Sequence, residues 1–295
     1  MNKLRFFQFA FWLLPRVPRR LAQYCAIVVG YGLWLGAPKL RQRVRANLAH
    51  IPTLAANPQR LDHTTRVAFA HLLLNYLDLF APPDRADPNF FTHFPIADEG
   101  LIHEILQAGK GCIMISLHNS TLEIAQQRLC HLLNIPIIVP MEALEPPALY
   151  DLLAQQRGRK GISFLPVSRS ETLRDMLTTL RQGNGVLMAV DRDIVQTGVI
   201  MPFFNAPARL PVGVVALARR TGAPIVWVSA WRVGIDRYAG SMVQLPLEID
   251  ADTRGDAAVR HALYPIVKRM EAVIMAHPEQ WLAVFADDIW AEANH

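Results

Sequence analysis

The feature that most constrains the fold is a series of short, β-rich apolar runs separated by stretches with helical periodicity. The uncharged apolar runs occupy residues 112–117, 135–139, 162–165, 186–190 and 225–228. The helical stretches occupy residues 122–133, 144–156, 171–181 and 212–220. Apolar runs without alternation are typical of strands that are covered on both faces. The chain therefore predicts an α/β fold with a mostly parallel central sheet covered by helices.

Three further elements are predicted outside this alternation. Apolar residues recur at helical spacing from about residue 54 to Phe80, and Pro82 and Pro83 follow. A long helix is predicted over residues 256–276, and the apolar run 281–285 is interpreted as a last strand. The sequence contains no internal repeat and no low-complexity linker, so we expect residues 51–295 to form one α/β domain.

Residues 1–50 differ in composition from the rest of the chain. An aromatic and aliphatic run over 6–14 is followed by Arg16, Arg19 and Arg20, and residues 21–38 carry no charge before a second basic cluster. A bilayer-spanning helix needs about 20 apolar residues, so this stretch would cross only a thinned bilayer or would lie half-buried in its surface. A buried amphipathic helix of the core is the alternative. We expect residues 1–50 to be a membrane-anchoring or interfacial helical segment.

The overall composition is consistent with a membrane partner. Thirty Lys and Arg residues against twenty-five Asp and Glu residues give a net charge of +5, while 52% of the residues are hydrophobic. This combination favours an anionic membrane surface over nucleic acid as the partner, with the basic side facing the cytoplasm. Cys25, Cys112 and Cys130 are odd in number and widely spaced, which excludes a disulfide scaffold and a zinc-ligand cluster. No metal site is predicted.

The first candidate for catalysis is His118, which comes directly after the run 112–117 and five positions before Glu123. A histidine can take a hydroxyl proton near neutral pH while a carboxylate orients its ring. The start of the next helix would also offer backbone N–H groups to an anion. The alternative is structural: residues 120–123, Ser-Thr-Leu-Glu, read as a capping box in which Glu123 bonds back to Ser120.

A second candidate cluster, Asp191, Arg192 and Asp193, directly follows the apolar run 186–190. The carboxyl ends of parallel strands face the ligand crevice of an open α/β sheet, so we expect these side chains near His118. An ion-pair lattice without catalysis is the alternative.

Arg192 and Asp193 of this cluster are predicted to contact substrate, and so are three other basic residues. Arg209 precedes a predicted helix start and suits an anionic carrier, while Arg157 and Arg159 form a basic patch that is otherwise a solvated surface. The sequence has no Gly-x-Ser-x-Gly elbow, no phosphate-binding Gly-Lys loop and no dinucleotide fingerprint.

Together these residues resemble a known family over nearly the whole chain. The chain is similar to the lipid A late acyltransferases and the mycobacterial phosphatidylinositol mannoside acyltransferase, a branch of the lysophospholipid-acyltransferase-like superfamily. The matching segments are residues 41–48, 76–78, 118–123, 189–193, 198–199, 203–204, 208–211, 218–224 and 278–281.

The resemblance implies a glycerolphosphate-acyltransferase-like fold and transfer of a fatty acyl group from an acyl thioester, acyl-CoA or acyl-ACP, to a hydroxyl of a membrane glycolipid. No other cofactor is implied. His118 is then the general base, and either Glu123, at the acidic position of the His-x4-acid motif, or Asp191, at the carboxylate position of the mannoside enzyme, orients it. We expect the enzyme at the cytoplasmic face of the inner membrane.

The chain departs from the family in one place. The family usually has Gly-Asn-Trp before the acidic residue, whereas Ser120, Thr121 and Leu122 stand here. The exchange puts the acceptor or the acyl-chain pocket in question, because Trp fills a large apolar volume. Two alternatives to transfer stay open: a family member that binds lipid or glycolipid without catalysis, and a thioesterase or esterase that uses water as the acceptor.

Overall fold

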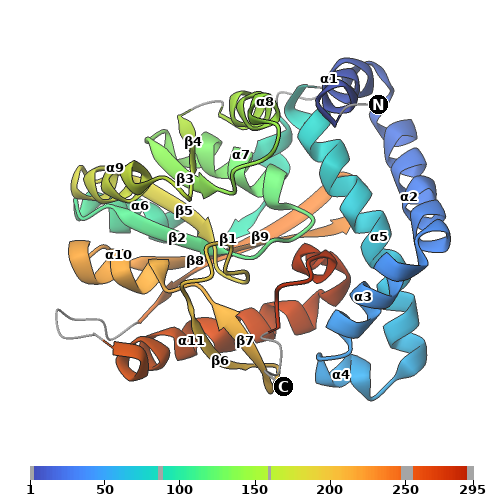
Figure 1. Cartoon of the computed structure of the whole chain (residues 1–295). Helices are drawn as coiled ribbons and strands as arrows, with labels where there is room; N and C mark the ends of the chain where they lie inside the picture. Colours follow the sequence, from blue (N-terminus) through green and yellow to red (C-terminus); the bar gives the residue numbers. More distant parts are fainter. Residues whose placement is uncertain (1–2, 86–88, 159–160, 247–254, 291–295) are drawn as a thin grey trace.

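A seven-stranded sheet forms the centre of the computed structural model, which describes residues 3–85, 89–158, 161–246 and 255–290 (Figure 1). The sheet contains β1 (Ile96–Ala97), β2 (Cys112–Ser116), β3 (Ile137–Met141), β4 (Ile162–Pro166), β5 (Gly185–Ala189), β8 (Ile225–Gly234) and β9 (Arg237–Leu245). Their order is β1-β9-β8-β2-β5-β3-β4, and only β8 and β9 pair antiparallel. The predicted α/β fold with a mostly parallel sheet is therefore confirmed.

The five predicted strands are β2, β3, β4, β5 and the first part of β8. All five residues of β2 are buried, as expected for a strand covered on both faces. The sequence pattern did not predict β9. Its residues alternate between buried and more exposed positions near one edge of the sheet, so it lacks a continuous apolar run.

Helices cover both faces of the sheet (Figure 1). They are α6 (Gly100–Gln107), α7 (Leu122–Leu133), α8 (Pro147–Arg157), α9 (Ser170–Arg181), α10 (Gly213–Thr221) and α11 (Gly255–Ala276). Ile113 and Ile115 of β2 belong to the hydrophobic core shared with α9, α10 and α11, whereas Met114 belongs to the core shared with α6 and α7. Successive side chains of a strand point to opposite faces, which explains this division.

The predicted strand over residues 281–285 is wrong. This region forms two short 3-10 helices, η4 (Pro278–Gln280) and η5 (Leu282–Phe285). Trp281 makes one isolated bridge to Asn119, and Val284 is fully buried in the core around α11. The apolar run is therefore buried by packing across the end of β2, without joining the sheet.

A separate antiparallel hairpin follows β5. It consists of β6 (Val199–Phe203) and β7 (Ala206–Leu210) and packs near α11. A Cβ at Gly198 would lie 2.0 Å from the carbonyl oxygen of Leu210, so the hairpin closes only with glycine at this position.

The amino-terminal part of the chain is helical. It contains α1 (Lys3–Leu13), α2 (Arg19–Gly36), α3 (Pro38–Leu48), α4 (Pro52–Ala55) and α5 (Pro58–Phe80), with the short 3-10 helices η1 (Leu14–Arg16), η2 (Pro83–Arg85) and η3 (Phe90–His93). The predicted helix that ends at Phe80 is α5, and its start is fixed by Asn57, whose side chain accepts from the backbone N–H of Arg60.

Helix α2 lies along α5 (Figure 1). The two backbones approach closely at Gly30, where a Cβ would be 2.7 Å from the Cα of Ala70. The opposite face of α2 is apolar and exposed, with Val28 at 69% and Leu35 at 65% exposure. Among the described helices, none alone is long and apolar enough to cross a membrane, and one pair, α2 with α3, passes that test together with a 98° bend between them.

Candidate active site

His118 and Asp191 lie beside each other because they follow neighbouring parallel strands. Ser116 at the end of β2 is paired with Ala189 at the end of β5. His118 and Asp191 each come two positions after the end of their strand, so the two side chains meet at the carboxyl ends of the strands, where ligands bind in open α/β sheets.

Asp191 holds the His118 ring from a fully buried position. The His118 Nδ1 atom is 2.8 Å from Asp191 Oδ1, and the His118 backbone N–H donates to the two carboxylate oxygens at 3.2 and 3.1 Å. The indole N–H of Trp281 donates to Oδ2 at 2.8 Å. Asp191 is 0% exposed and the His118 side chain 31% exposed. A carboxylate only accepts, so Nδ1 carries the proton and Nε2 keeps its lone pair.

The electrostatics of the pair follow from this geometry. Burial lowers the pKa of His118, but the adjacent Asp191 charge and its hydrogen bond outweigh burial, and the pKa lies above its ordinary value. Burial raises the pKa of Asp191, but the charge and hydrogen bonds of His118 and the Trp281 hydrogen bond outweigh it, and the pKa lies below its ordinary value. Asp191 is therefore an anion that raises the basicity of the His118 imidazole.

His118 lines a cavity of about 550 Å³ that is mainly apolar. The cavity extends from the ends of β2 and β5 along α8 and reaches α1 and α5. Its apolar walls are Phe7, Leu79, Leu122, Val139, Pro140, Met141, Leu144, Leu149, Leu153, Phe164, Leu187, Met188, Ala189 and Ile194. Its polar and charged lining consists of Lys3, Tyr76, Ser116, His118, Gln126, Glu142, Arg157 and Arg192. This size and lining suit a ligand with one long apolar part.

Glu123, the other candidate partner of His118, is paired elsewhere. The guanidinium of Arg157 donates to both of its carboxylate oxygens, with Nε at 3.0 Å from Oε2. The Glu123 side chain is 3% exposed and that of Arg157 21% exposed. Within the described residues, Glu123 makes no hydrogen bond to His118. The structure thus brings Asp191 to the histidine, and it places Arg157 on the cavity wall with Glu123 behind it.

The alternative interpretation of residues 120–123 as a capping box is wrong. The residue before α7 is Thr121, and it makes no side-chain cap hydrogen bond. The expected anion-binding amides are also occupied: the Ser120 N–H donates to the Gln280 carbonyl at 2.8 Å, and the Thr121 N–H donates to the Asn119 side chain at 3.2 Å. Residues 119–121 are instead fastened to η4 and β8, because Asn119 and Thr121 both donate to the carbonyl of Ala230.

Arg192 lies on the cavity wall and already has two acidic partners. Its Nε is 2.7 Å from Asp288 Oδ1, and its Nη1 is 3.3 Å from Glu142 Oε2. Arg192 therefore joins β3, β5 and the carboxyl-terminal segment at the cavity. These ion pairs correspond to the alternative interpretation of the cluster as an ion-pair lattice, and Arg192 lines the same cavity as His118.

The remaining predicted substrate contacts lie away from the cavity lining. Asp193 is buried, and its Oδ2 accepts the Gly198 N–H at 2.7 Å. Arg209 on β7 donates to the Gly198 carbonyl at 3.3 Å. Both therefore hold the base of the β6–β7 hairpin. Arg159 lies outside the described residues.

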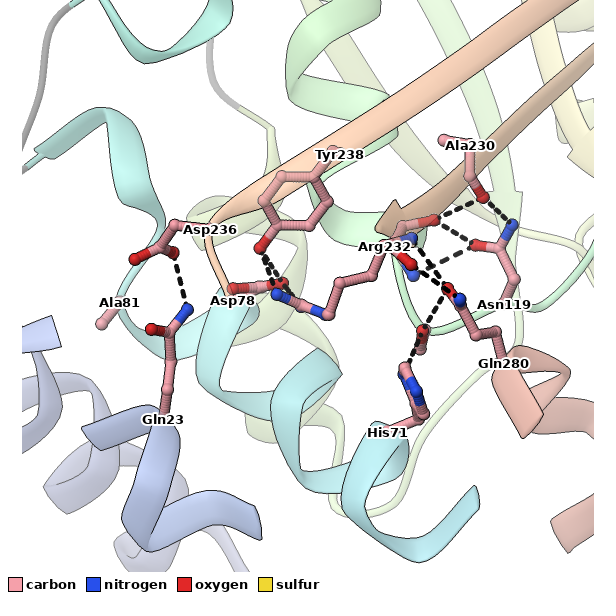
Figure 2. A network of polar contacts seen from close by, with 12 residues as sticks. Gln23, His71, Asp78, Ala81, Asn119, Ala230, Arg232, Asp236, Tyr238 and Gln280 are labelled. Atoms are coloured by element: carbon pink, nitrogen blue, oxygen red, sulfur yellow. Dashed lines mark hydrogen bonds and ion pairs between the residues drawn. The ribbon is translucent and has the colours of Figure 1, made fainter. Parts of the chain in front are cut away.

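A buried ionic network centred on Asp78 was not predicted (Figure 2). Asp78 of α5, 1% exposed, accepts from Arg232 at 2.5 Å, from Arg19 of α2 at 2.7 Å and from the Tyr238 hydroxyl at 3.1 Å. The sequence contained one signal for this network, because Asp78 is a charged residue within the apolar pattern of α5. The network fastens α2 to the sheet.

The network continues to the segment that carries His118. Gln280 accepts the backbone N–H of Arg232 at 2.8 Å and the Ser120 hydroxyl at 3.3 Å, and the Ser120 hydroxyl is 3.0 Å from His71 Nδ1 (Figure 2). Burial, with the Arg232 charge, lowers the pKa of His71 to about 3, so this histidine is neutral. The next residue, Trp281, holds Asp191. Neither Gln280 nor Trp281 was predicted from the sequence as a site residue.

Comparisons with known proteins identify the family of the chain. The chain matches the bacterial lipid A biosynthesis acyltransferase family over residues 4–285. It is 32% identical over 253 residues to phosphatidylinositol mannoside acyltransferase of Mycobacterium tuberculosis, covering 81% of this chain and 74% of that protein. It is 25% identical over 278 residues to the protein of the same name from Mycolicibacterium smegmatis, covering 92% and 86%. The protein therefore belongs to the bacterial lipid A biosynthesis acyltransferase family and is an acyltransferase.

Proposed function

We propose that the protein transfers a fatty acyl group from an acyl thioester, acyl-CoA or acyl-ACP, to a hydroxyl of a membrane glycolipid, with His118 as general base and Asp191 as its positioning residue. The observation that carries the proposal is the buried Asp191 carboxylate at 2.8 Å from His118 Nδ1, on the wall of a largely apolar cavity. The glycolipid acceptor is supported by the names of the mycobacterial relatives.

The proposed reaction needs no enzyme nucleophile. His118 Nε2 takes the proton of the acceptor hydroxyl while its oxygen attacks the thioester carbonyl carbon. The tetrahedral intermediate collapses, the carbon–sulfur bond breaks, and the imidazolium returns the proton to the leaving thiolate. The products are an ester and a thiol. Asp191 stabilises the transient imidazolium and keeps the proton on Nδ1.

In this proposal the cavity binds the acyl chain of the donor. An apolar chain gains roughly 0.8 kcal/mol for each methylene that leaves water, so the walls contributed by α8, β3 and β5 would bind it in proportion to its length. Leu122 stands where the family usually has Trp, and it lines the cavity. The smaller side chain leaves more room beside His118, which supports a donor chain or an acceptor different from that of the typical family member.

The amino-terminal helices support a membrane location for the reaction. Their exposed apolar residues, among them Phe9 at 52%, Trp12 at 55% and Val28 at 69%, lie close in sequence to Arg16 and Arg20. Apolar residues and arginines together favour an anionic bilayer surface. We place the enzyme at the cytoplasmic face of the inner membrane, with residues 1–50 as its anchoring segment, and expect no cofactor besides the donor.

The decisive experiment compares membranes from cells that express the wild type, His118→Ala or the control His261→Ala, whose histidine is exposed on α11. Each membrane receives labelled long-chain acyl thioesters and the host glycolipid extract, and the products are separated by mass. We expect acylated glycolipid with the wild type and the control only. An amount of product with His118→Ala equal to that of the wild type would refute the assignment of His118 as the general base.

The same assay separates the two alternative functions. Free fatty acid that depends on His118, without acylated lipid, would identify a thioesterase. Absence of any product with every donor and extract, while the folded protein still retains labelled glycolipid, would identify a binding protein without catalysis.

A further inference from the structure

Helix α1 has two apolar stripes. Leu4, Phe7 and Phe11 pack with the buried core formed by α5 and α8, whereas Phe6, Phe9 and Trp12 are 48%, 52% and 55% exposed. Residues three and four positions apart share one face of a helix, so each set forms a stripe. A helix that is apolar on both sides is typical of burial on both sides, and the chain covers only one.

The inner stripe of α1 reaches the catalytic cavity. Lys3 and Phe7 line the same cavity as His118, together with Tyr76 and Leu79 of α5 and Leu149 and Leu153 of α8. Since the outer face of α1 is exposed, this one helix forms the wall between the cavity and the surroundings of the protein. Figure 1 shows α1 lying over the ends of α5 and α8, at the outer margin of the fold.

The Phe7 ring packs against two aromatic side chains of α5 in that wall. It meets Phe80 at 5.3 Å and Tyr76 at 6.4 Å between ring centroids, both edge to face. Edge-to-face packing is a favourable arrangement of aromatic rings. An acyl chain whose carbonyl carbon lies at His118 and whose tail runs along α8 would therefore meet an aromatic surface.

We propose that Phe7 is the specificity-determining residue that ends the acyl cavity and sets the longest donor chain the enzyme accepts, while the opposite stripe of the same helix inserts into the bilayer. This inference rests on the proposed acyl transfer. In this proposal α1 both limits the length of the donor acyl chain and forms part of the membrane-facing surface.

The test uses two opposite changes at Phe7 and one matched control. Phe7→Ala removes the ring from the wall, whereas Phe7→Trp adds volume to it. Phe9→Ala makes the same deletion two residues away on the outer stripe. Wild type and variants are assayed with lauroyl, myristoyl, palmitoyl and stearoyl thioesters, and kcat/KM is measured for each donor.

We expect Phe7→Ala to move the preferred donor to a longer member of the series and Phe7→Trp to move it to a shorter one. Each methylene that gains or loses burial is worth roughly fourfold in affinity, so the ratio of stearoyl to myristoyl turnover is expected to change by about tenfold or more in each direction. We expect Phe9→Ala to leave this ratio unchanged and to lower the fraction of the protein that sediments with anionic vesicles.

A binding measurement keeps this test independent of catalysis. In the His118→Ala background, free fatty acids of the same lengths displace a fluorescent fatty acid. The dependence of displacement on chain length is compared between His118→Ala alone and the double variants that also carry Phe7→Ala or Phe7→Trp. If the protein with His118 intact shows no transfer, but the length dependence of fatty acid binding still changes with the residue at position 7, the proposed function is refuted and the proposed length limit stands. An unchanged length dependence in both Phe7 variants, or the same change in both, would overturn the inference.

Discussion

Replacing Asp191 by Asn tests the proposed base most directly, because it removes one charge and almost no volume. The carboxylate accepts three N–H groups, two from His118 and one from Trp281. An asparagine has one accepting oxygen and a donating NH2 group. If the oxygen faces His118, the NH2 group meets the Trp281 N–H. If the oxygen faces Trp281, the NH2 group meets Nδ1, which must then lose its proton.

The magnitude follows from this conflict. In the second arrangement His118 carries its proton on Nε2 and is no longer a base, and the wrong tautomer costs about 10⁴-fold in kcat in comparable triads. In the first arrangement a buried donor is unpaired and a charge-assisted hydrogen bond is lost, which lowers the free energy of unfolding by about 3 kcal/mol. We therefore expect a folded, less stable enzyme with kcat reduced by about 10³-fold to 10⁴-fold.

The pH dependence has a definite sign. His118 acts as a base only when neutral, so wild-type activity rises with pH through its raised pKa. Without the Asp191 charge this pKa falls, and any residual activity begins at lower pH. Stability changes too: the pairing stabilises the fold below the raised pKa of His118 and above the lowered pKa of Asp191, and it is lost outside that window.

The assay measures kcat against pH and unfolding by urea for the wild type, Asp191→Asn and the control Asp175→Asn, which lies exposed on α9. A variant that keeps more than about a tenth of the wild-type kcat, with the wild-type pH profile, would refute the assignment of Asp191, since the residual rate in a triad without its carboxylate is far lower.

Three further outcomes are expected. Trp281→Phe removes the donor to Asp191 and leaves the carboxylate more basic, so kcat measured against pH should rise at higher pH than in the wild type, and unfolding should need about 2 kcal/mol less; an unchanged profile would contradict the role of the indole. Glu123→Gln breaks a buried ion pair and is expected to lower stability by about 3 kcal/mol while leaving the pH profile of turnover unshifted, as measured by urea unfolding and initial rates. Gly30→Ala should lower stability by about 2 kcal/mol by separating α2 from α5, whereas the control Gly32→Ala, where a Cβ meets nothing within 4 Å, should be neutral or stabilising in a thermal melt.

Much of the fold was predictable because the signals are local. Buried parallel strands need continuous apolar runs, and β2, β3, β4 and β5 have them. The placement of His118 and Asp191 at strand ends followed from the same runs. The hairpin partner β9 escaped prediction because it alternates, and residues 281–285 were mistaken for a strand because an apolar run does not reveal whether it pairs in a sheet or packs across its end.

The choice between the two carboxylates needed the tertiary structure. Glu123 is five residues from His118 in sequence, and Asp191 is 73 residues away. Spacing along the chain favoured the first, but sheet order places β5 directly beside β2, and the first turn of α7 directs Glu123 to Arg157. Strand order is set by the packing of whole elements, which no short motif encodes.

The sequence by itself determined the α/β class, the strand ends that carry polar residues and the family to which the chain belongs, because each depends on local patterns. Only the tertiary structure decided that Asp191 contacts the His118 ring, that Trp281 donates to Asp191, and that α1 lines the cavity. These contacts join residues far apart in the sequence, such as His118 and Asp191 with a separation of 73 positions and Trp281 and Asp191 with a separation of 90, and their geometry arises from how helices and strands pack around one core.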